Sequence, residues 1–282
     1  MEAFRKSFNS FFAMKCTVYL LAFLGFCLAQ SSSEVLEPLC AVVEPIRKAV
    51  DLPGPRIIGG YEVEPNSVPY QVAVVMNGNN LCGGSLISTT RVLTAAHCTL
   101  IAAFVELRFG AHYHNQNEPT QVRLTSTSFI NHERYDAATV ENDISVILLP
   151  SPVAITAAIQ VVPLAPSTAP DFQGRLAFLT GWGVTESFQL SPVLNGVNLT
   201  IISNNECRSF FSIVRDSTLC TSGIGPQGIV SACNSDSGGP LVVDGVQVGV
   251  VSFGAGDCQG GSPTGFARVS AFREWIRTNA EV

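Results

Sequence analysis

Lysine is almost absent from this chain of 282 residues, which carries a formal net charge of −6. Its three lysines are Lys6, Lys15 and Lys48, so residues 57–282 contain none. In that stretch ten arginines face seventeen acidic residues. An acidic segment without lysine does not present the basic surface that nucleic acids require, so nucleic-acid binding is excluded.

The apolar run near the amino terminus is too short for a comfortable membrane span. It covers residues 17–29, thirteen positions, whereas a spanning helix needs about 20. Basic residues precede the run and the small Ala29 ends it, which is the pattern of an export signal. We expect residues 1–29 to be a signal peptide, with Met14 as an alternative start. The protein is then secreted and leaves the membrane when the signal is removed.

Export permits disulfides, and the chain has nine cysteines. Cys16 and Cys27 are lost with the signal, which leaves an odd number, seven. At least one of these cannot pair within the chain. Cys40 stands in an otherwise cysteine-free stretch, so we expect it to be the unpaired one.

The boundary at Arg56 separates two kinds of sequence. Residues 30–56 are polar and end in "PGPR", and "IIGG" follows abruptly. An exposed loop of this kind is a site for cleavage after Arg56 by a protease that prefers arginine. On composition alone, an ordinary interdomain linker is the alternative.

Helical periodicity is scarce before residue 270. From 57 to 269 short β-branched runs are separated by Gly, Pro, Asn and Ser. Asp244 and Gly245 stand between two apolar runs, which predicts a β-hairpin. Residues 270–280 have helical spacing, with Ser270 as the candidate cap. These patterns predict an all-β domain closed by one helix.

Serine is a weak nucleophile unless a base activates it, so the chemistry of "SACNSDSGGP" depends on the chain's four histidines. His97 lies in "TAAHC", and Asp143 leads into the apolar run of "NDISVILL". A buried acid needs a partner, and a histidine that donates a ring N–H is suitable. A satisfied core histidine is the alternative for His97. His112 and His114 could hold a metal, but a solvated loop is the better interpretation, so we expect no metal.

Five motifs in a fixed order resemble the chymotrypsin-type serine proteases over residues 57–279: "IIGG", "TAAHC", "NDISVILL", "TGWG" and "DSGGP". The family resemblance implies two antiparallel six-stranded β-barrels packed together, with a C-terminal α-helix. The expected limits within the peptidase domain, residues 57–282, are about 57–165 for barrel one, about 175–269 for barrel two and about 270–280 for the helix. No cofactor is implied.

The resemblance assigns roles to three residues. Ser237 matches the nucleophile, His97 the general base and acid, and Asp143 the residue that orients His97. The backbone N–H groups of Ser235 and Ser237 match the oxyanion hole. The family has glycine where this chain has Ser235, so a side chain brings crowding or strain there.

The resemblance also explains the Arg56 boundary. Cleavage after Arg56 frees the amine of Ile57, which then pairs with the carboxylate of Asp236. Residues 30–56 are then an activation propeptide. The uncut chain is an inactive zymogen that a trypsin-like protease activates.

Four residues match the pocket that receives the side chain before the cut bond: Ser231, Ser252, Gly254 and Thr264. Ser231 stands where trypsin-like members carry aspartate, and a hydroxyl cannot neutralise a buried cation. Gly254 leaves one wall open, whereas Thr264 narrows the other. We predict uncharged substrates, with aromatic and leucine side chains slightly ahead of small aliphatic ones. Asp257 near the pocket mouth could admit some basic residues, but a solvated loop acid is the better interpretation.

The resemblance implies three disulfides, which are Cys82–Cys98, Cys207–Cys220 and Cys233–Cys258. Ala111 after Gly110 replaces the acid with which the calcium loop of trypsins begins, so no calcium is expected. The "NLT" sequon places a possible glycan on Asn198.

The expected partners are protein or peptide substrates, the activating protease and protein inhibitors, and we expect a monomer. Two alternatives remain open. The first is a catalytically impaired homologue that acts as a binding or regulatory module, which Ser235 alone favours. The second is a processing protease of an extracellular cascade, although such enzymes often carry longer amino-terminal domains than the roughly two dozen residues before Arg56.

Overall fold

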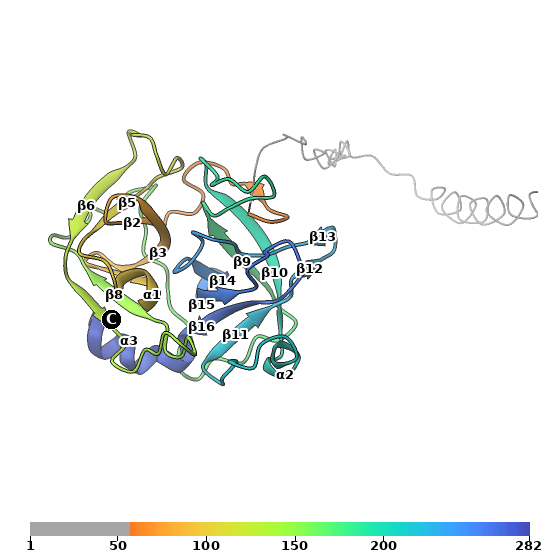
Figure 1. Ribbon diagram of the computed structural model, residues 1–282. Coiled ribbons are helices and arrows are strands. Elements are labelled where there is room, and N and C mark those ends of the chain that lie inside the picture. Colours follow the sequence, from red (N-terminus) through yellow and green to blue (C-terminus); the bar gives the residue numbers. More distant parts are fainter. Residues whose placement is uncertain (1–56) are drawn as a thin grey trace, which may run out of the picture. The chain divides into compact units, whose positions relative to one another are not determined.

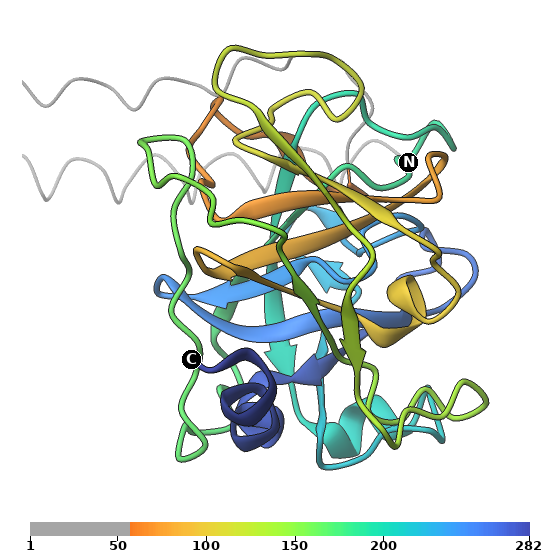
Figure 2. The ribbon, with the colours of Figure 1, turned by 90° about the vertical axis from the view of Figure 1, so that its left-hand side faces the viewer.

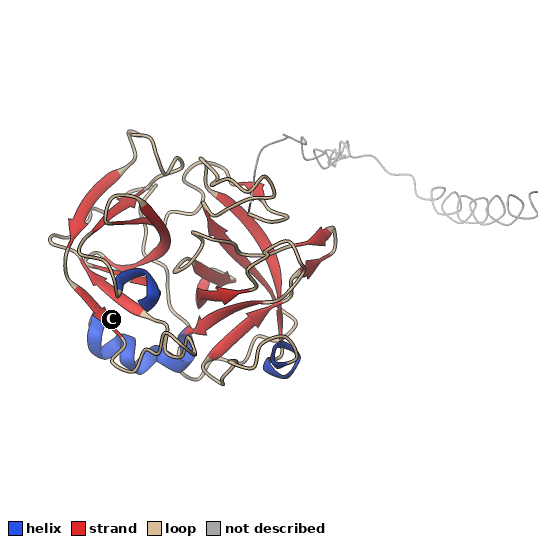
Figure 3. Ribbon diagram, viewed as in Figure 1, coloured by secondary structure: helices blue, strands red, loops and turns tan. Residues whose placement is uncertain are grey.

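The computed structural model describes residues 57–282, so the expected signal peptide, propeptide and Cys40 lie outside the described residues. Two rolled antiparallel sheets lie side by side, and helices are few (Figure 1). Figure 3 shows how strongly strands predominate. None of the helices within residues 57–282 is long and apolar enough to cross a membrane.

The first sheet has seven strands and corresponds to the expected barrel one. Its edge strands, β6 and β7, are not hydrogen-bonded to each other within the described residues, so the sheet is rolled but open. Along β5 and β6 every second side chain is more buried than its neighbours, which turns one face toward the core. The strands in spatial order are β6 (Val122–Ser126), β5 (Val105–Phe109), β2 (Gln71–Met76), β3 (Asn80–Ser88), β4 (Arg91–Thr94), β8 (Ser145–Leu148) and β7 (Phe129–Asn131).

The second sheet closes on itself into a six-stranded barrel, because β9 pairs with both β10 and β14. The two-residue strand β1 adds to the outside of β10. A separate hairpin, β12 with β13, projects from this half (Figure 1). The strands are β1 (Tyr61–Glu62), β10 (Asn195–Ile202), β11 (Thr218–Thr221), β16 (Thr264–Arg268), β15 (Val246–Gly254), β14 (Pro240–Val243), β9 (Leu176–Gly181), β12 (Ile224–Gly225) and β13 (Gly228–Ile229).

The predicted hairpin at Asp244–Gly245 is confirmed. These two residues connect β14 to β15, with φ angles of 49° and 79°. Two successive positive φ values match the right-handed twist of the flanking strands, which is why Asp-Gly is favoured at such turns.

Within residues 57–282 four helical segments accompany the strands: α1 (Ala96–Thr99), α2 (Asn204–Arg208), the 3₁₀ turn η1 (Val269–Phe272) and α3 (Arg273–Ala280). The prediction of Ser270 as a helix cap is wrong, because Ser270 lies inside η1 and α3 begins after Phe272 without a side-chain cap. The C-terminal helix packs against the first sheet. The ring of Trp275 lies 5.1 Å from that of His132, and its indole N–H donates to Glu133 at 2.9 Å.

Polar contacts join the two halves of the molecule. Figure 2 gives the ribbon of both halves, viewed from the side of the first sheet. The hydroxyl of Ser85 on β3 donates to Gln247 on β15 at 2.7 Å. The hydroxyl of Thr180 on β9 donates to Gln71 on β2 at 2.7 Å. Buried hydrogen bonds of this kind depend on correct alignment of both partners, so they fix how the two sheets are placed at the site between them.

The three disulfides are the pairs that the resemblance implies: Cys82–Cys98, Cys207–Cys220 and Cys233–Cys258. The first joins β3 to α1, the second closes the loop between α2 and β11, and the third joins the segment before Ser237 to the loop after β15. The first disulfide therefore fixes the segment that carries His97, and the third fixes the segment that precedes Ser237.

Candidate active site

The pairing of β4 with β8 brings His97 and Asp143 together. Thr94 at the end of β4 lies opposite Ser145 at the start of β8, so the residues that follow one strand and precede the other meet at the same edge. The backbone N–H of His97 donates to Asp143 Oδ1 at 2.9 Å, and Nδ1 of the ring lies 2.7 Å from Oδ2. A carboxylate accepts from Nδ1–H, so Nε2 is left as the unprotonated, basic nitrogen.

Asp143 has a third donor. The hydroxyl of Ser252 on β15 donates to Asp143 Oδ2 at 2.6 Å, across the boundary between the two halves. The carboxylate is only 1% exposed, so three hydrogen bonds replace its lost hydration. The sequence predicts Ser252 only as part of the substrate pocket. No local signal indicates its contact with an acid 109 positions away.

Ser237 lies on the loop that precedes β14. Its carbonyl accepts from the N–H of Gly83 at 2.7 Å, which fixes the loop against β3. Cys98 Sγ lies 3.7 Å from both the Ser237 carbonyl oxygen and His97 Nε2. Within residues 57–282 the Ser237 hydroxyl makes no hydrogen bond, including none to His97. Such contacts are often long until substrate binds, so the placement is compatible with a nucleophile and its base.

The sulfurs of Cys82 and Cys98 and a ring nitrogen of His97 lie within 4.8 Å of one another. The two sulfurs are joined in a disulfide, so they offer no thiolate to a metal. His112 is buried, with Nε2 at 2.8 Å from a carboxylate oxygen of Glu62. The interpretation of His112 as part of a solvated loop is therefore wrong, and its side chain serves a structural contact.

The turn before Ser237 places Ser235 in the left-handed region. Its φ is 75°, and the N–H of Asp236 donates to the Cys233 carbonyl at 3.0 Å, as in a β-turn that needs positive φ at its third residue. Gly238 has a φ of 79°, and a Cβ there would lie 2.2 Å from Thr94 Oγ1. The backbone therefore requires glycine at Gly238, whereas Ser235 occupies its conformation at a cost in strain.

Asp236 is a fully buried carboxylate beneath this turn. Its oxygens accept from the N–H of Gly183 at 2.8 Å and of Cys233 at 2.9 Å. Loss of hydration raises the pKa of Asp236 to about 7, and the two N–H donors only partly oppose this. Within residues 57–282 no basic side chain forms an ion pair with it. When Asp236 is ionised without an ion-pair partner, a nearby cation would stabilise it.

A cavity of about 220 Å³ opens beside Ser237. Ser252, Gly254 and Thr264 line it, and none of the residues that line it is charged. Ser231 does not line the cavity. It is buried behind the wall, where its hydroxyl donates to the Ala232 carbonyl at 2.7 Å and lies 3.1 Å from Thr264 Oγ1.

Asp257 is exposed and is not part of the cavity wall, although its neighbours Gly256 and Cys258 are. Its side chain therefore lies with the solvated loop. Asn198, the sequon residue, is exposed on β10.

The sequence model of the trypsin family matches residues 57–276, about four fifths of the chain. The chain belongs to the trypsin family. It is 39% identical to a chymotrypsin from Phaedon cochleariae, over 95% of this chain and 99% of that protein. It is 44% identical to a brachyurin from Leptuca pugilator, over 80% of this chain and 99% of that protein.

A solved structure of HL collagenase superposes on this trypsin-family chain with a TM-score of 0.73 and 31% identity, over 80% of this chain and 99% of that one. The expected chymotrypsin-like fold and the resemblance to chymotrypsin-type proteases are therefore confirmed, although the first sheet is open and seven-stranded rather than a closed six-stranded barrel. Family membership and these relatives make the protein a serine endopeptidase, with proteins or peptides as its substrates.

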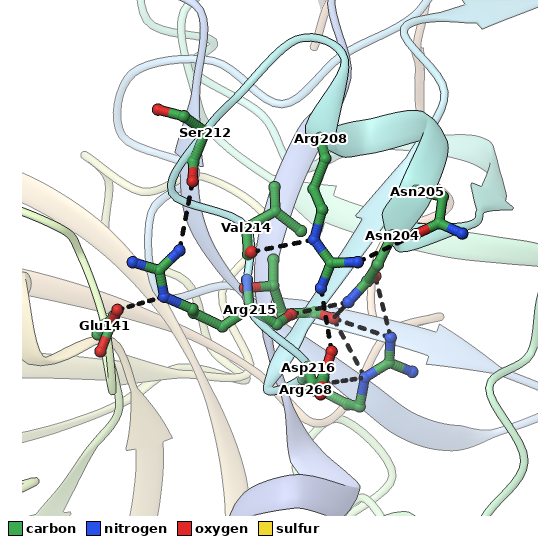
Figure 4. Close-up of polar contacts among 10 residues, drawn as sticks. Glu141, Asn204, Asn205, Arg208, Ser212, Val214, Arg215, Asp216 and Arg268 are labelled. Carbon is green, nitrogen blue, oxygen red and sulfur yellow. Dashed lines mark hydrogen bonds and ion pairs between the residues drawn. The ribbon is translucent and has the colours of Figure 1, made fainter.

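A polar network beside Asp143 ties this trypsin-family enzyme's two halves together on the surface (Figure 4). Arg215, in the loop closed by Cys207–Cys220, forms an ion pair with Glu141, two residues before Asp143. Arg208 pairs with Asp216 in the same loop at 3.0 Å. Burial lowers the pKa of Arg268, which holds the Thr218 carbonyl at 2.8 Å. The network limits movement of the segment that leads to Asp143.

We expect Ser235→Gly to stabilise this trypsin-family enzyme. The change removes about 1–2 kcal/mol of left-handed strain and adds about 0.5–1 kcal/mol of backbone entropy, so the net gain is about 0.5–1 kcal/mol. For a domain of this size the midpoint of thermal unfolding should rise by about 1–4 °C. The measurement is made in a Ser237→Ala background to prevent self-digestion. Ser235→Ala is the matched control, since it keeps the strain, and a lower midpoint for the glycine variant would contradict the interpretation.

Proposed function

We propose that this protein is a secreted serine endopeptidase made as a zymogen, activated by cleavage after Arg56, which cuts peptide bonds after uncharged residues. The double hydrogen bond between His97 and Asp143, beside a cavity that Ser237 lines, carries the catalytic part of the proposal. The signal-like residues 1–29 support secretion.

In the proposed reaction the Ser237 oxygen attacks the substrate carbonyl carbon as His97 Nε2 takes the hydroxyl proton. The C–N bond then breaks, and the proton passes from His97 to the departing amine. Water repeats the sequence on the acyl-enzyme and regenerates Ser237. Asp143 holds the tautomer and stabilises the imidazolium, which is the mechanism known for this family.

The negative charge that develops on the carbonyl oxygen needs donors that are already in place. We assign this role to the backbone N–H groups of Ser235 and Ser237. The turn with a φ of 75° at Ser235 supports the assignment, because it gives serine the conformation that the family reserves for glycine. A working oxyanion hole is therefore compatible with Ser235. This argues against the catalytically impaired homologue.

Activation is assigned to the buried carboxylate of Asp236. In the uncut chain the nitrogen of residue 57 is an uncharged amide, so it cannot neutralise Asp236. Cleavage after Arg56 would convert it into an ammonium group. Ile57 is fully buried and its backbone pairs with Thr185, close to Gly183, whose N–H holds Asp236. The new cation would be formed close to Asp236, which has no ion-pair partner within residues 57–282.

The specificity assignment follows from the uncharged cavity wall. A relative named trypsin delta, from Drosophila erecta, is 37% identical to this chain, so relatedness alone does not decide the preferred residue. A cation in a cavity lined only by uncharged side chains would lose its hydration without gaining a partner. We therefore assign uncharged side chains, with aromatic and leucine residues ahead of alanine and valine.

A peptide panel tests this assignment on the cut enzyme. The peptides vary only the residue before the cut bond, as Phe, Leu, Ala, Val or Arg. We expect kcat/KM for Phe and Leu to exceed that for Arg by about 100-fold or more, because the Arg cation would lose its hydration in the cavity without gaining a partner. A ratio of 100 corresponds to about 2.7 kcal/mol in the activation free energy.

Thr264→Gly should raise kcat/KM for Phe relative to Ala by about tenfold, since it widens the cavity. Thr218→Ser, on the buried strand β11, is a control that leaves the cavity wall unchanged. Activity confined to Ala and Val in the unsubstituted enzyme would mean that Thr264 closes the cavity. Strong cleavage after Arg would overturn the assignment from the uncharged cavity wall.

A further inference from the structure

Two neighbouring residues before Glu186 are bonded to the turn that would form the oxyanion hole. The N–H of Gly183 donates to Asp236 Oδ1 at 2.8 Å. The N–H of Val184 donates to the carbonyl of Asn234, in the same turn, at 2.8 Å. The backbone at 183–184 therefore responds to any movement of that turn.

The next residue in the chain contacts the segment that begins at Ile57. Thr185 pairs with Ile57 in an antiparallel bridge, and Ile58 pairs with Ser231 on the other side. The N–H of Ser231 donates to the Ile58 carbonyl at 3.1 Å. Residues 57–58 therefore lie between the Thr185 backbone and the backbone at the rear of the substrate cavity.

Glu186 completes this series with a side-chain contact. Its Oε1 accepts from the backbone N–H of Gly59 at 2.7 Å. Gly59 has a φ of 69°, and a Cβ there would lie 2.3 Å from the Ile229 carbonyl oxygen. The segment is thus pressed against Ile229 on one side and held by the Glu186 carboxylate on the other. The backbone carbonyl of Glu186 accepts a hydrogen bond from the side chain of Gln259 at 3.3 Å. Gln259 follows Cys258, which lines the cavity.

We infer that Glu186 is a positioning residue that holds the new amino-terminal segment in its docked place and links it to the oxyanion turn and the cavity wall. The inference rests on the proposed activation at Arg56. Glu186 itself does not touch substrate. It acts through Gly59, which lies two residues from the ammonium group that would pair with Asp236.

The consequence can be measured at high pH. Docking needs the protonated amine of Ile57, and a free α-amino group loses its proton near pH 8. Docking beside Asp236 raises the pH at which the amine loses its proton. The rise is about one pH unit for each tenfold increase in the docking equilibrium constant. The ionisable side chains hydrogen-bonded to residues 57–59, 183–186 or 229–231, within the described part of the chain, are Asp236 and Glu186. Loss of a charge-assisted hydrogen bond at an exposed site should weaken docking about tenfold.

The test compares Glu186→Ala, Glu186→Gln and Glu186→Asp after cleavage, with Ile57 confirmed as the terminus by sequencing. The midpoint of the alkaline loss of kcat/KM should fall by about one pH unit in the alanine variant, while the acid limb is unchanged. Glutamine keeps an acceptor at the same reach and should restore at least half of the shift. Aspartate keeps the charge but withdraws the oxygen by one methylene, so it should behave like alanine.

Glu206→Ala, which removes an exposed carboxylate on α2, is the matched control and should leave both limbs unchanged. An alkaline midpoint in Glu186→Ala and Glu186→Asp equal to that of the unsubstituted enzyme would overturn the role of Glu186 and leave the proposed function intact. Inactivity of the correctly cut, unsubstituted protein at every pH would instead overturn the proposed function. Should the alanine variant not be secreted, the difference between glutamine and aspartate decides the matter alone.

Discussion

Replacement of Ser237 by alanine is expected to lower kcat/KM of the cut enzyme by about six orders of magnitude. A loss of this size is typical when the serine nucleophile of a catalytic triad is removed. His97 and Asp143 would keep their two hydrogen bonds, but the base would have no hydroxyl to deprotonate. The measurement is hydrolysis of a Phe peptide at pH 8. Titration of active sites corrects each preparation for its content of competent enzyme.

The other two serines of the same stretch provide the controls. Ser231 is buried against Thr264, so Ser231→Ala should change the preference for substrate by tenfold at most and leave turnover in place. In the proposed mechanism Ser235 acts through its backbone N–H, which Ser235→Ala keeps, so this variant should retain turnover. A loss of six orders in either variant, or a smaller loss than 1,000-fold in Ser237→Ala, would contradict the assignment of the nucleophile.

Asp236→Asn is expected to lower the activity of the cut enzyme by about 100- to 1,000-fold. An asparagine cannot pair with the Ile57 ammonium group, and a buried ion pair that loses one partner costs about 3–5 kcal/mol. The docked segment would then leave its place and the oxyanion turn would lose its support. Activity is measured after cleavage, with Ile57 confirmed as the terminus, so that a failure to cut is not mistaken for a failure to dock.

The raised pKa of Asp236 supports the proposal that the uncut chain is inactive. The pKa in the folded, uncut chain is about 7, above the ordinary value near 4. A carboxyl with a raised pKa stabilises the fold at low pH and loses that contribution as pH rises from about 4 through about 7. At pH 8 the ionised carboxylate is therefore disfavoured in its buried position, and the Ile57 ammonium group of the proposed cut form would relieve this.

Arg56→Gln is the matched variant for this prediction. Trypsin should no longer produce a terminus at Ile57, so the protein should remain about as inactive as the uncut chain. Full activity of Arg56→Gln after trypsin treatment, or of cut Asp236→Asn, would contradict activation through this ion pair.

The sequence was sufficient to predict features that depend only on interactions between neighbouring residues. Asp244–Gly245 favours positive φ at two successive residues, so the hairpin could be predicted without knowing its neighbours. The C-terminal helix could be predicted from its spacing, but its start could not. The chain turns through η1 first, so Ser270 does not cap α3.

The site depends on contacts between distant segments, which the sequence revealed only through its resemblance to a family. The register of β4 with β8 decides that His97 meets Asp143, and no property of either motif contains that register. Ser252 donates a hydrogen bond to Asp143, which lies 109 positions before it in the sequence. Glu186 accepts one from Gly59, which lies 127 positions before it. Ser231 turned toward Thr264 rather than the cavity is likewise a result of packing.

Ser235 shows where a departure from the family pattern could be noticed but not interpreted. The sequence indicates strain at this position, and the φ of 75° gives its physical form. Whether serine holds the turn depends on Asp236, whose N–H closes the turn and whose carboxylate fixes it to Gly183.

The measurement that tests the account most directly is covalent labelling by a serine-directed organophosphorus reagent, before and after limited trypsin treatment of the secreted chain. Mass spectrometry of the digested protein locates the adduct and identifies the amino terminus. The account predicts a single adduct on Ser237, formed only when Ile57 is the terminus, and lost in His97→Ala. An adduct on Ser231 or Ser235, equal labelling of the uncut chain, or no labelling of the correctly cut chain would contradict it.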